Sequence, residues 1–190
     1  MPEPAAIDSA PPLPGRAIIR QRWSDLVFLH WRVEPDTVAP LLPSGTRPDL
    51  DANGDTWVGL IPFVLSRSQF LPPLPAVPYF GTFVECNVRL YSIDEAGRRG
   101  VVFRSLDAQR ALAVLAARAL FGLPYRWAAM SMERTAADRL EYRSRRLEGG
   151  SVRPSTHIVA RPGTTPVDTE LSRFLTARWG FHERVRGRTI

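Results

Sequence analysis

One short run of the 190-residue chain carries the side chains best suited to acid–base chemistry. Residues 83–91 read FVECNVRLY, which is typical of a β-strand, and side chains alternate between the two faces of a strand. Glu85, Asn87, Arg89 and Tyr91 therefore share one face, whereas apolar residues occupy the other. Glu85 and Arg89 lie about 13 Å apart along the strand, too far to pair directly. The face thus combines an acid, an amide, a guanidinium and a phenol in a row.

Three interpretations of this polar face are open. In the first, the face lies in water, as on many antiparallel strands. In the second, it lies inside a barrel or beneath the proline-rich segment 71–78, where burial raises the pKa of a carboxyl group and a nearby arginine lowers it. Glu85 could then act as a general acid or base. In the third, Glu85, Asn87 and Arg89 form a buried network that fixes strand register.

Two candidates lie outside this strand. Arg118 shares a face of a predicted helix with apolar residues, and a buried arginine there needs a carboxylate partner, for which Glu85 or Asp107 is available. Tyr125 begins another predicted strand, and its hydroxyl can donate a hydrogen bond to a developing oxyanion. A packing role is the alternative for Tyr125.

The histidines and the single cysteine point to little chemistry of their own. His30 stands in the apolar segment 25–33, where it is either a core histidine or part of a ligand site. Cys86 lies on the apolar face of its strand, so we expect it in the core rather than as a nucleophile. The three histidines lack metal-ligand spacing, and no glycine-rich phosphate loop is present. We therefore expect neither a metal site nor a cofactor.

Composition excludes several classes of protein. All 25 basic residues are arginine, so a Schiff base with a carbonyl substrate could form only at the N-terminal amine. One cysteine cannot make an internal disulfide. No run of about 18 apolar residues could span a membrane, and the N-terminus lacks the apolar core of a signal peptide. These features predict a cytoplasmic protein.

The charge is unevenly distributed along the chain. Residues 1–97 carry 7 arginines and 11 acidic residues, whereas residues 98–190 carry 18 and 8. A basic half raises the possibility of a nucleic-acid partner. The arginines are dispersed among acidic residues rather than grouped in a block, which favours a solvated surface and makes a nucleic-acid partner the weaker prediction.

The pattern of elements predicts an α+β fold, in which an antiparallel, barrel-like sheet has two or three flanking helices. Residues 1–15 contain five prolines and predict a disordered arm, followed by a single domain over 16–190. The expected strands lie at 17–23, 25–33, 47–51, 55–67, 80–93, 100–106, 125–134, 139–147 and 152–161.

Turn and helix signals complete this prediction. Asn53-Gly54 predicts a hairpin turn, and Pro62 predicts an edge, a bend or a bulge. Asp107 is expected to cap a helix over 108–121 whose apolar face includes Leu112 and Leu115. Pro35 can start a short helix, and a last helix is expected at 166–179.

Taken together, several segments resemble the YqjF-like family, the domain of unknown function 2071. The resemblance covers roughly residues 20–180, and its motifs are specific in combination rather than singly. It rests on WSDLVFLHW at 23–31, WVGLIPF at 57–63, FVECNVRLY at 83–91, SLD at 105–107, AR at 117–118, LPY at 123–125 and YRSR at 142–145.

The resemblance has consequences for both fold and site. The family is similar in fold to acetoacetate decarboxylase, whose superfamily has a closed barrel-like sheet around a cavity with acid and arginine groups beside a lysine. It implies that Glu85 and Arg89 face such a cavity. The lysine Schiff-base mechanism does not carry over, because this chain has no lysine. Family members usually continue past the last helix, so we expect a truncated chain and an open sheet edge.

Two functions follow as expectations. The first is a lysine-independent enzyme, without a cofactor, that transfers a proton or breaks a bond beside a carbonyl of a small anionic ligand such as a keto acid. The catalytic residues would be Glu85, Arg89 and Tyr125, and the ligand-binding residues Asn87, Arg118 and His30. An arginine would hold the carboxylate or enolate by charge-assisted hydrogen bonds. The alternative is a non-enzymatic module whose arginine-rich half binds an acidic partner.

Overall fold

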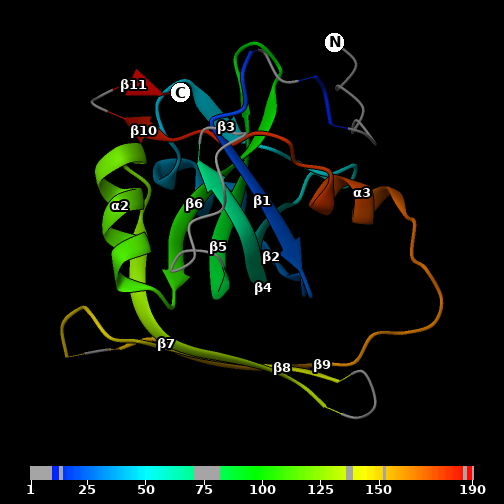
Figure 1. Ribbon diagram of the computed structural model, residues 1–190. Coiled ribbons are helices and arrows are strands. Elements are labelled where there is room, and N and C mark those ends of the chain that lie inside the picture. Colours follow the sequence, from blue (N-terminus) through cyan, green and yellow to red (C-terminus); the bar gives the residue numbers. More distant parts are fainter. Residues whose placement is uncertain are drawn as a thin grey trace.

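A curled, mixed β-sheet organises the protein, and three helices pack around it (Figure 1). The computed structural model describes residues 10–12, 15–70, 82–135, 139–151, 153–185 and 188–189. Most of the predicted arm at 1–15 and the proline-rich segment 71–78 lie outside these residues. The predicted α+β architecture is confirmed.

The main sheet follows the strand order β1-β4-β5-β6-β7-β8-β9 within the described residues, and β2 and β3 add to it alongside β4 and β5. Its strands are β1 (Ile19–Ser24), β2 (Leu29–Val33), β3 (Thr46–Pro48), β4 (Thr56–Phe70), β5 (Thr82–Asp94), β6 (Arg99–Ala108), β7 (Tyr125–Arg134), β8 (Leu140–Arg146) and β9 (Ser155–Ala160). Two short strands, β10 (Arg184–Val185) and β11 (Arg188–Thr189), pair with each other. The helices are α1 (Pro35–Val38), which leads into a 3-10 turn at Ala39–Leu41, α2 (Ala111–Phe121) and α3 (Glu170–Thr176).

One pair of strands departs from the predicted antiparallel sheet. β6 and β7 run parallel, with Leu106 opposite Tyr125. Parallel neighbours need a crossover connection, and α2 supplies it. This crossover brings the first residue of β7 beside the end of β6, which decides where Tyr125 lies.

Helix α2 differs from its prediction at its start and in its buried face. β6 continues to Ala108, so α2 begins only at Ala111, and Asp107 binds Arg146 instead of capping the helix. Leu112 and Leu115 are exposed, whereas the opposite face of the helix turns toward the sheet. The helix ends as predicted, at a glycine with φ of 68°.

The Asn53-Gly54 turn is present, but the hairpin predicted around it is wrong. Gly54 has φ of 83°, and its N–H donates to the carbonyl of Asp51 at 3.0 Å. The strand before the turn, β3, pairs with β5 and not with β4. The carboxylate of Asp51 accepts hydrogen bonds from the backbone N–H groups of Asn53 and Asp55, so a side chain stabilises the turn without a strand ladder.

Pro62 occupies the one stretch of β4 where its missing N–H costs nothing. On its outer side, β4 pairs with β2 through residue 60 and with β1 from residue 64 onward. Pro62 falls in the gap between these two partners, where its carbonyl accepts a hydrogen bond from Val27 at 3.1 Å. The prediction of an irregular position is thereby confirmed.

Both faces of β5 are buried. Its apolar face, with Val84 and Cys86, packs against β7, β8 and β9, which turn back across the sheet. Burial and neighbouring Asp107 raise the pKa of the Cys86 thiol to about 12, as expected for a core residue. The polar face is covered by α2, β1 and the C-terminal segment, residues 170–185. The interpretation that places this polar face in water is therefore wrong.

The C-terminal segment is attached to the sheet by a buried ion pair. Arg178, which follows α3, binds the carboxylate of Asp49, and both side chains are almost fully buried. The guanidinium of Arg178 also lies 4.4 Å from the ring centre of Phe174. Arg99 approaches the same carboxylate at 3.5 Å. One carboxylate thus serves two arginines from distant parts of the chain.

We expect Asp49→Asn to lower the free energy of unfolding by about 3–5 kcal/mol, because it leaves buried guanidinium charge without a carboxylate. Chemical denaturation at pH 7 measures the change. Asp168→Asn is the matched control, since Asp168 binds Arg173 on the surface and its substitution should change the free energy of unfolding much less. Equal losses in the two variants would show that the buried pair contributes no more than an exposed one.

Candidate active site

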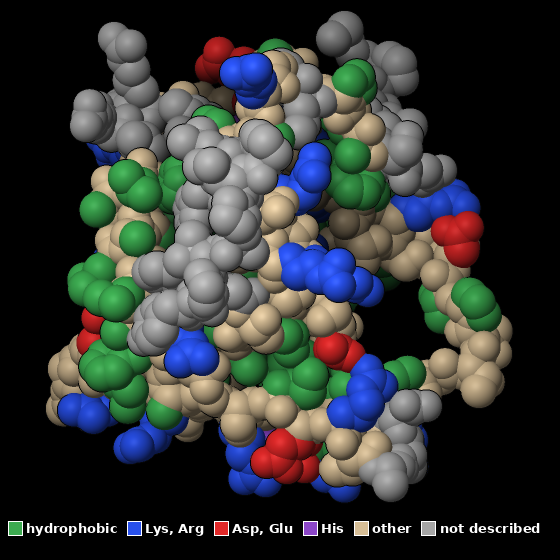
Figure 2. Space-filling model, in the orientation of Figure 1, with side chains coloured by type: hydrophobic (Ala, Val, Ile, Leu, Met, Phe, Trp, Pro, Cys, Tyr) green, Lys and Arg blue, Asp and Glu red, His purple; other side chains and the backbone are tan. Residues whose placement is uncertain are grey.

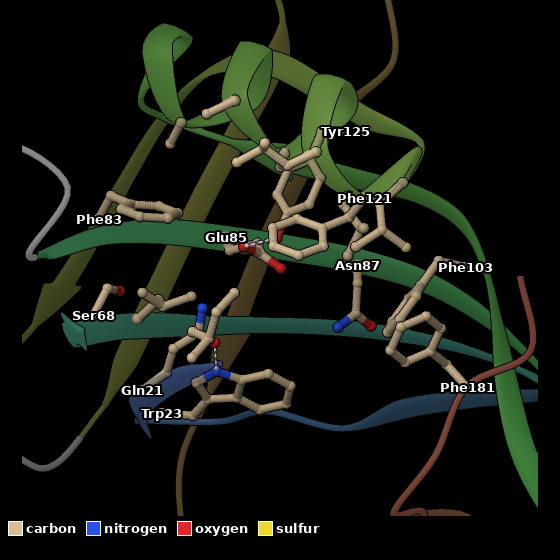
Figure 3. Close-up of a pocket in the computed structure, with 18 of the residues that line it drawn as sticks. Gln21, Trp23, Ser68, Phe83, Glu85, Asn87, Phe103, Phe121, Tyr125 and Phe181 are labelled. Carbon is tan, nitrogen blue, oxygen red and sulfur yellow. Dashed lines mark hydrogen bonds between the residues drawn. The ribbon is translucent and has the colours of Figure 1, made fainter. Parts of the chain in front are cut away.

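A cavity of about 920 Å³ lies between α2, β1 and the polar face of β5 (Figure 3). Most of the side chains that line it are apolar. The aromatic members of this lining are Trp23, Phe83, Phe103, Phe121, Tyr125 and Phe181, and its polar members are Gln21, Ser68, Glu85 and Asn87. A cavity of this size and composition suits a small organic molecule.

Glu85 and Asn87 reach the cavity from the middle of β5. Their alternation with buried apolar residues places both on the face toward α2, as the sequence predicts. Each is nearly inaccessible to solvent, with 2% and 1% of the residue surface exposed. Two polar side chains thus lie at the bottom of a mainly apolar cavity.

Tyr125 completes this polar group from the start of β7. Its hydroxyl donates a hydrogen bond to Oε2 of Glu85 at 3.1 Å (Figure 3). The two residues are 40 positions apart in sequence, and the parallel pairing of β6 with β7 brings them together. Burial, with Glu85 nearby, raises the pKa of the Tyr125 phenol, so the hydroxyl keeps its proton and remains a donor.

Burial also sets the protonation state of Glu85. Desolvation raises the pKa of its carboxyl to about 8, although the hydrogen bond from Tyr125 acts in the opposite direction. Glu85 is therefore mainly a neutral acid at pH 7. A carboxyl group with a pKa close to physiological pH can serve as either proton donor or proton acceptor.

The amide of Asn87 is only partly satisfied. Its Oδ1 atom is buried and has no hydrogen-bond partner among the described residues. Figure 3 shows the amide extending from β5 toward the side of the cavity where Phe103 and Phe181 lie. A buried amide oxygen without a partner is costly, so this group is a ready contact for a ligand.

Arg89 and His30 lie in a second cluster and do not line the cavity. Arg89 donates from Nε to the hydroxyl of Tyr91 at 3.1 Å and from Nη2 to the carbonyl of Leu175 at 2.8 Å. His30 Nε2 lies 2.6 Å from the same hydroxyl. Burial, together with the charge of Arg89, lowers the pKa of His30 to about 4, so this imidazole is neutral. Gly59 lies between the two side chains, where an added Cβ would come within 3.3 Å of both.

Glu85 and Arg89 do not share a hydrogen-bond partner among the described residues, unlike in the predicted network that fixes strand register. The hydrogen-bond partners of Arg89 are a phenol and a backbone carbonyl, while Glu85 binds Tyr125. The polar face of β5 thus divides into an acid–amide pair at the cavity and an arginine–tyrosine pair under the C-terminal segment. Glu85 is not the partner whose loss would leave Arg89 unpaired.

Arg118 lies behind Tyr125 rather than in the cavity. Its Nε donates to the backbone carbonyl of Tyr125 at 2.7 Å, and its guanidinium binds Glu148, which also accepts a hydrogen bond from the N–H of Trp127. The expected partners of Arg118, Glu85 and Asp107, are both engaged elsewhere. Arg118 therefore fixes the start of β7, and its role as a ligand-binding residue stays a prediction.

Several cavity residues escaped the sequence analysis. Ala113, Ala116 and Ala117 form a face of small side chains on α2, and this face leaves room for the cavity. Their i, i+3, i+4 spacing is visible in the sequence and was the available signal. Trp23 and Phe181 come from the two ends of the described chain, and no local pattern connects them.

Among the described residues, no three His, Cys, Asp or Glu side chains gather as a metal site would require. No helix in the described part of the chain is long and apolar enough to cross a membrane.

The fold is similar to that of acetoacetate decarboxylase and related solved proteins. The acetoacetate decarboxylase of Legionella pneumophila subsp. pneumophila str. Philadelphia 1 superposes with a TM-score of 0.56 at 19% identity, over 90% of this chain and 59% of that one. The enduracididine biosynthesis enzyme MppR gives 0.52 at 16% identity, over 77% and 58%. An acetoacetate decarboxylase-like enzyme from Sphingomonas wittichii RW1 gives 0.52 at 16% identity, over 75% and 55%. The chain thus spans less than two thirds of each solved protein.

Sequence similarity identifies the family. The family DUF2071, described as an uncharacterized conserved protein, matches residues 20–190. The uncharacterized protein YqjF of Bacillus subtilis (strain 168) is 35% identical over 179 residues, which cover 92% of this chain and 71% of that protein. The chain belongs to the DUF2071 family, as the sequence resemblance predicts.

The pKa of Glu85 predicts how stability depends on pH. The folded protein holds the Glu85 proton more tightly than the unfolded chain, whose carboxyl titrates near 4.5. This contribution to stability is therefore complete below about pH 4.5 and is lost as the pH rises to 8, with a limiting slope of about 1.4 kcal/mol per pH unit. We expect Glu85→Gln, which stays neutral, to flatten this part of the profile.

Thermal unfolding at pH 5.5 and pH 8.5 tests this expectation. The wild type should lose more stability between the two values than Glu85→Gln does. Glu133→Gln, at an exposed position, should keep the wild-type dependence. Parallel profiles for wild type and Glu85→Gln would show that Glu85 is ionised in the folded protein.

Proposed function

We propose that this protein binds a small carbonyl compound in the cavity and that Glu85 transfers a proton to or from it. The observation that carries the proposal is a buried carboxyl group at the bottom of a mainly apolar cavity, with a phenol on one oxygen. Burial raises the pKa of this carboxyl group to about 8. Such an environment stores a proton close to neutral pH and excludes the water that would compete for it.

The chemistry follows from the two states of Glu85. In its acid form it donates a hydrogen bond or a proton to the carbonyl oxygen of the ligand. In its ionised form it removes a proton from the carbon next to the carbonyl, so that the C–H bond breaks and an enolate or enol forms. Glu85 exchanges this proton with solvent and then returns a proton to the carbon, which restores the ketone, or to the oxygen, which gives the enol. The phenol of Tyr125 keeps the carboxyl in place during both steps.

The charge of the lining favours a neutral ligand over the anionic one that the sequence analysis expects. The described residues that line the cavity include no arginine and no histidine. The arginines proposed to hold a carboxylate, Arg89 and Arg118, bind groups of the protein instead. A carboxylate beside Glu85 would also disfavour the ionised form of that residue. A ketone, aldehyde, ester or enone meets these conditions.

The comparisons support the carbonyl class without defining the reaction. MppR is known in complex with pyruvate, at a TM-score of 0.50 and 15% identity, and with a condensation product of pyruvate. Likeness at this level of identity is a likeness of fold. Lysine Schiff-base chemistry has no counterpart here, because the chain contains no lysine.

The arginine-rich half gives less support to the interaction-module alternative. Arg118, Arg146 and Arg178 all bind carboxylates within the fold. These arginines hold β7, β8 and the C-terminal segment in place, so the charge asymmetry of the sequence reflects internal ion pairs as well as surface.

Exchange of α-protons tests the proposal directly. In D₂O, we expect the wild type to accelerate the loss of α-proton NMR signals from 2-butanone, 2-octanone or acetophenone. Glu85→Gln should lower this rate by about a hundredfold or more, since general acid–base catalysis contributes at least that much. Glu133→Gln is the matched control on the surface and should exchange at the wild-type rate. Equal rates for wild type and Glu85→Gln would refute the role of Glu85.

The pH profile of the same exchange tests the role of Tyr125. When Glu85 acts as a base, the rate should rise with pH and level off above its pKa of about 8. The hydrogen bond from Tyr125 lowers this pKa, so Tyr125→Phe should move the midpoint upward, by up to about one pH unit. An unchanged midpoint in a folded Tyr125→Phe protein would mean that the hydrogen bond does not act on Glu85.

A further inference from the structure

We infer that the ligand is a bulky, neutral and largely apolar molecule that enters with its polar end first. Its carbonyl lies at Glu85, a hydroxyl or N–H group lies at Asn87, and its apolar body extends toward the mouth of the cavity. The inference rests on the proposed function, because that proposal places a carbonyl at Glu85. It adds the size, the polarity and the orientation of the ligand.

The orientation follows from a gradient of exposure along the cavity wall. Glu85 and Asn87 are nearly fully buried. Other members of the same wall are open to solvent, including Ile18 at 61% exposure, Trp23 at 45% and Leu120 at 69%. Glu85 and Asn87 thus lie at the deep end, and mainly apolar side chains, together with the exposed Gln21, lie at the open end. A ligand with a polar head and an apolar body matches this gradient only when its head is inside.

The size follows from the volume and the wall. About 920 Å³ lies at the upper end of the range for small-molecule sites, and a ligand of two or three carbons would fill only a small part of it. Trp23 stacks on Phe63 with ring centres 4.6 Å apart, which holds the indole in a fixed place at the mouth. Phe121 and the alanines of α2 form the opposite wall. Contact along this whole length makes the binding free energy of an apolar body more favourable.

The buried Oδ1 atom of Asn87 indicates that the ligand carries a hydrogen-bond donor. The Oδ1 atom of this residue has no partner among the described residues, and its neighbours on the wall include Phe103. The terminal torsion of an asparagine is soft, so either end of the amide can turn toward the cavity. Glu85 and Asn87 are two residues apart on one strand, with Cα atoms about 7 Å apart. A β-hydroxy ketone can therefore contact both.

A series of 2-alkanones with four to ten carbons tests the apolar body. We expect the dissociation constant, measured by calorimetry at pH 7, to fall about fourfold with each added methylene group while the chain remains inside the cavity. Alkanoates of equal length should bind at least about tenfold more weakly, since the described wall offers them no cation. Affinity that does not depend on chain length, or alkanoates that bind as tightly as ketones, would overturn the inference.

Two exposed leucines on α2 provide a matched pair of variants for the orientation. Leu120 belongs to the cavity wall, whereas Leu112 lies on the same helix outside it, and both are more than half exposed. Leu120→Ser should weaken binding of the longest ketone about fivefold or more and leave 2-butanone unaffected. Leu112→Ser should change neither. Equal effects of the two substitutions would exclude an apolar body at this mouth.

The role of Asn87 is tested with 4-hydroxy-2-octanone and 2-octanone. Wild type should prefer the hydroxy ketone about fivefold or more, and Asn87→Leu, which keeps the size of the side chain, should abolish this preference while still binding 2-octanone. A preference that survives in Asn87→Leu would overturn the contact. Binding and proton exchange are separate measurements. Tight, length-dependent binding without exchange would refute only the catalytic proposal, and exchange without length dependence would refute only this inference.

Discussion

The burial of both faces of β5 is the constraint on which the rest of the structure depends. One face packs against the three strands that turn back across the sheet, and the other faces α2 and the C-terminal segment. A carboxyl group in the middle of such a strand has no access to bulk water. Its ionised form is therefore penalised, and the pKa of Glu85 rises to about 8. The raised pKa on which our proposal depends is a consequence of this layered packing.

β5 also carries a second polar pair, Arg89 and Tyr91, whose role is structural. Arg89 and Tyr91 bind the carbonyl of Leu175, and Arg178 binds Asp49 nearby, so the C-terminal segment is held over one end of the sheet. Other arginines reach the surface, where Figure 2 shows them in blue and dispersed over the face in view. Guanidinium groups thus bind the buried oxygens of Leu175 and Asp49. These arginines bind groups of the protein, and no arginine or histidine lines the described part of the cavity. For this reason we propose a neutral carbonyl ligand and not an anionic one.

The acetoacetate decarboxylase-like fold supplies the cavity but does not determine the chemistry. Solved proteins of similar fold include enzymes, and the present chain shares the curled sheet with them. It lacks any lysine, so the side-chain amine needed for a Schiff base is missing. Glu85, a carboxyl group with a phenol beside it, is chemically different from a lysine amine, and it is the group that we propose to act on a carbonyl.

The sequence by itself determined which side chains of β5 share a face, because the two-residue repeat of a strand follows from backbone geometry. It also determined the family, the α+β class and the absence of lysine chemistry. It could not determine that Glu85 and Arg89 serve different clusters, since this depends on Leu175, which covers Arg89 from 86 positions away. Nor could it place the hydroxyl of Tyr125 on Glu85, because a parallel crossover brings these residues together. Local periodicity is encoded in neighbouring residues, whereas the membership of a site depends on which distant segments pack over it.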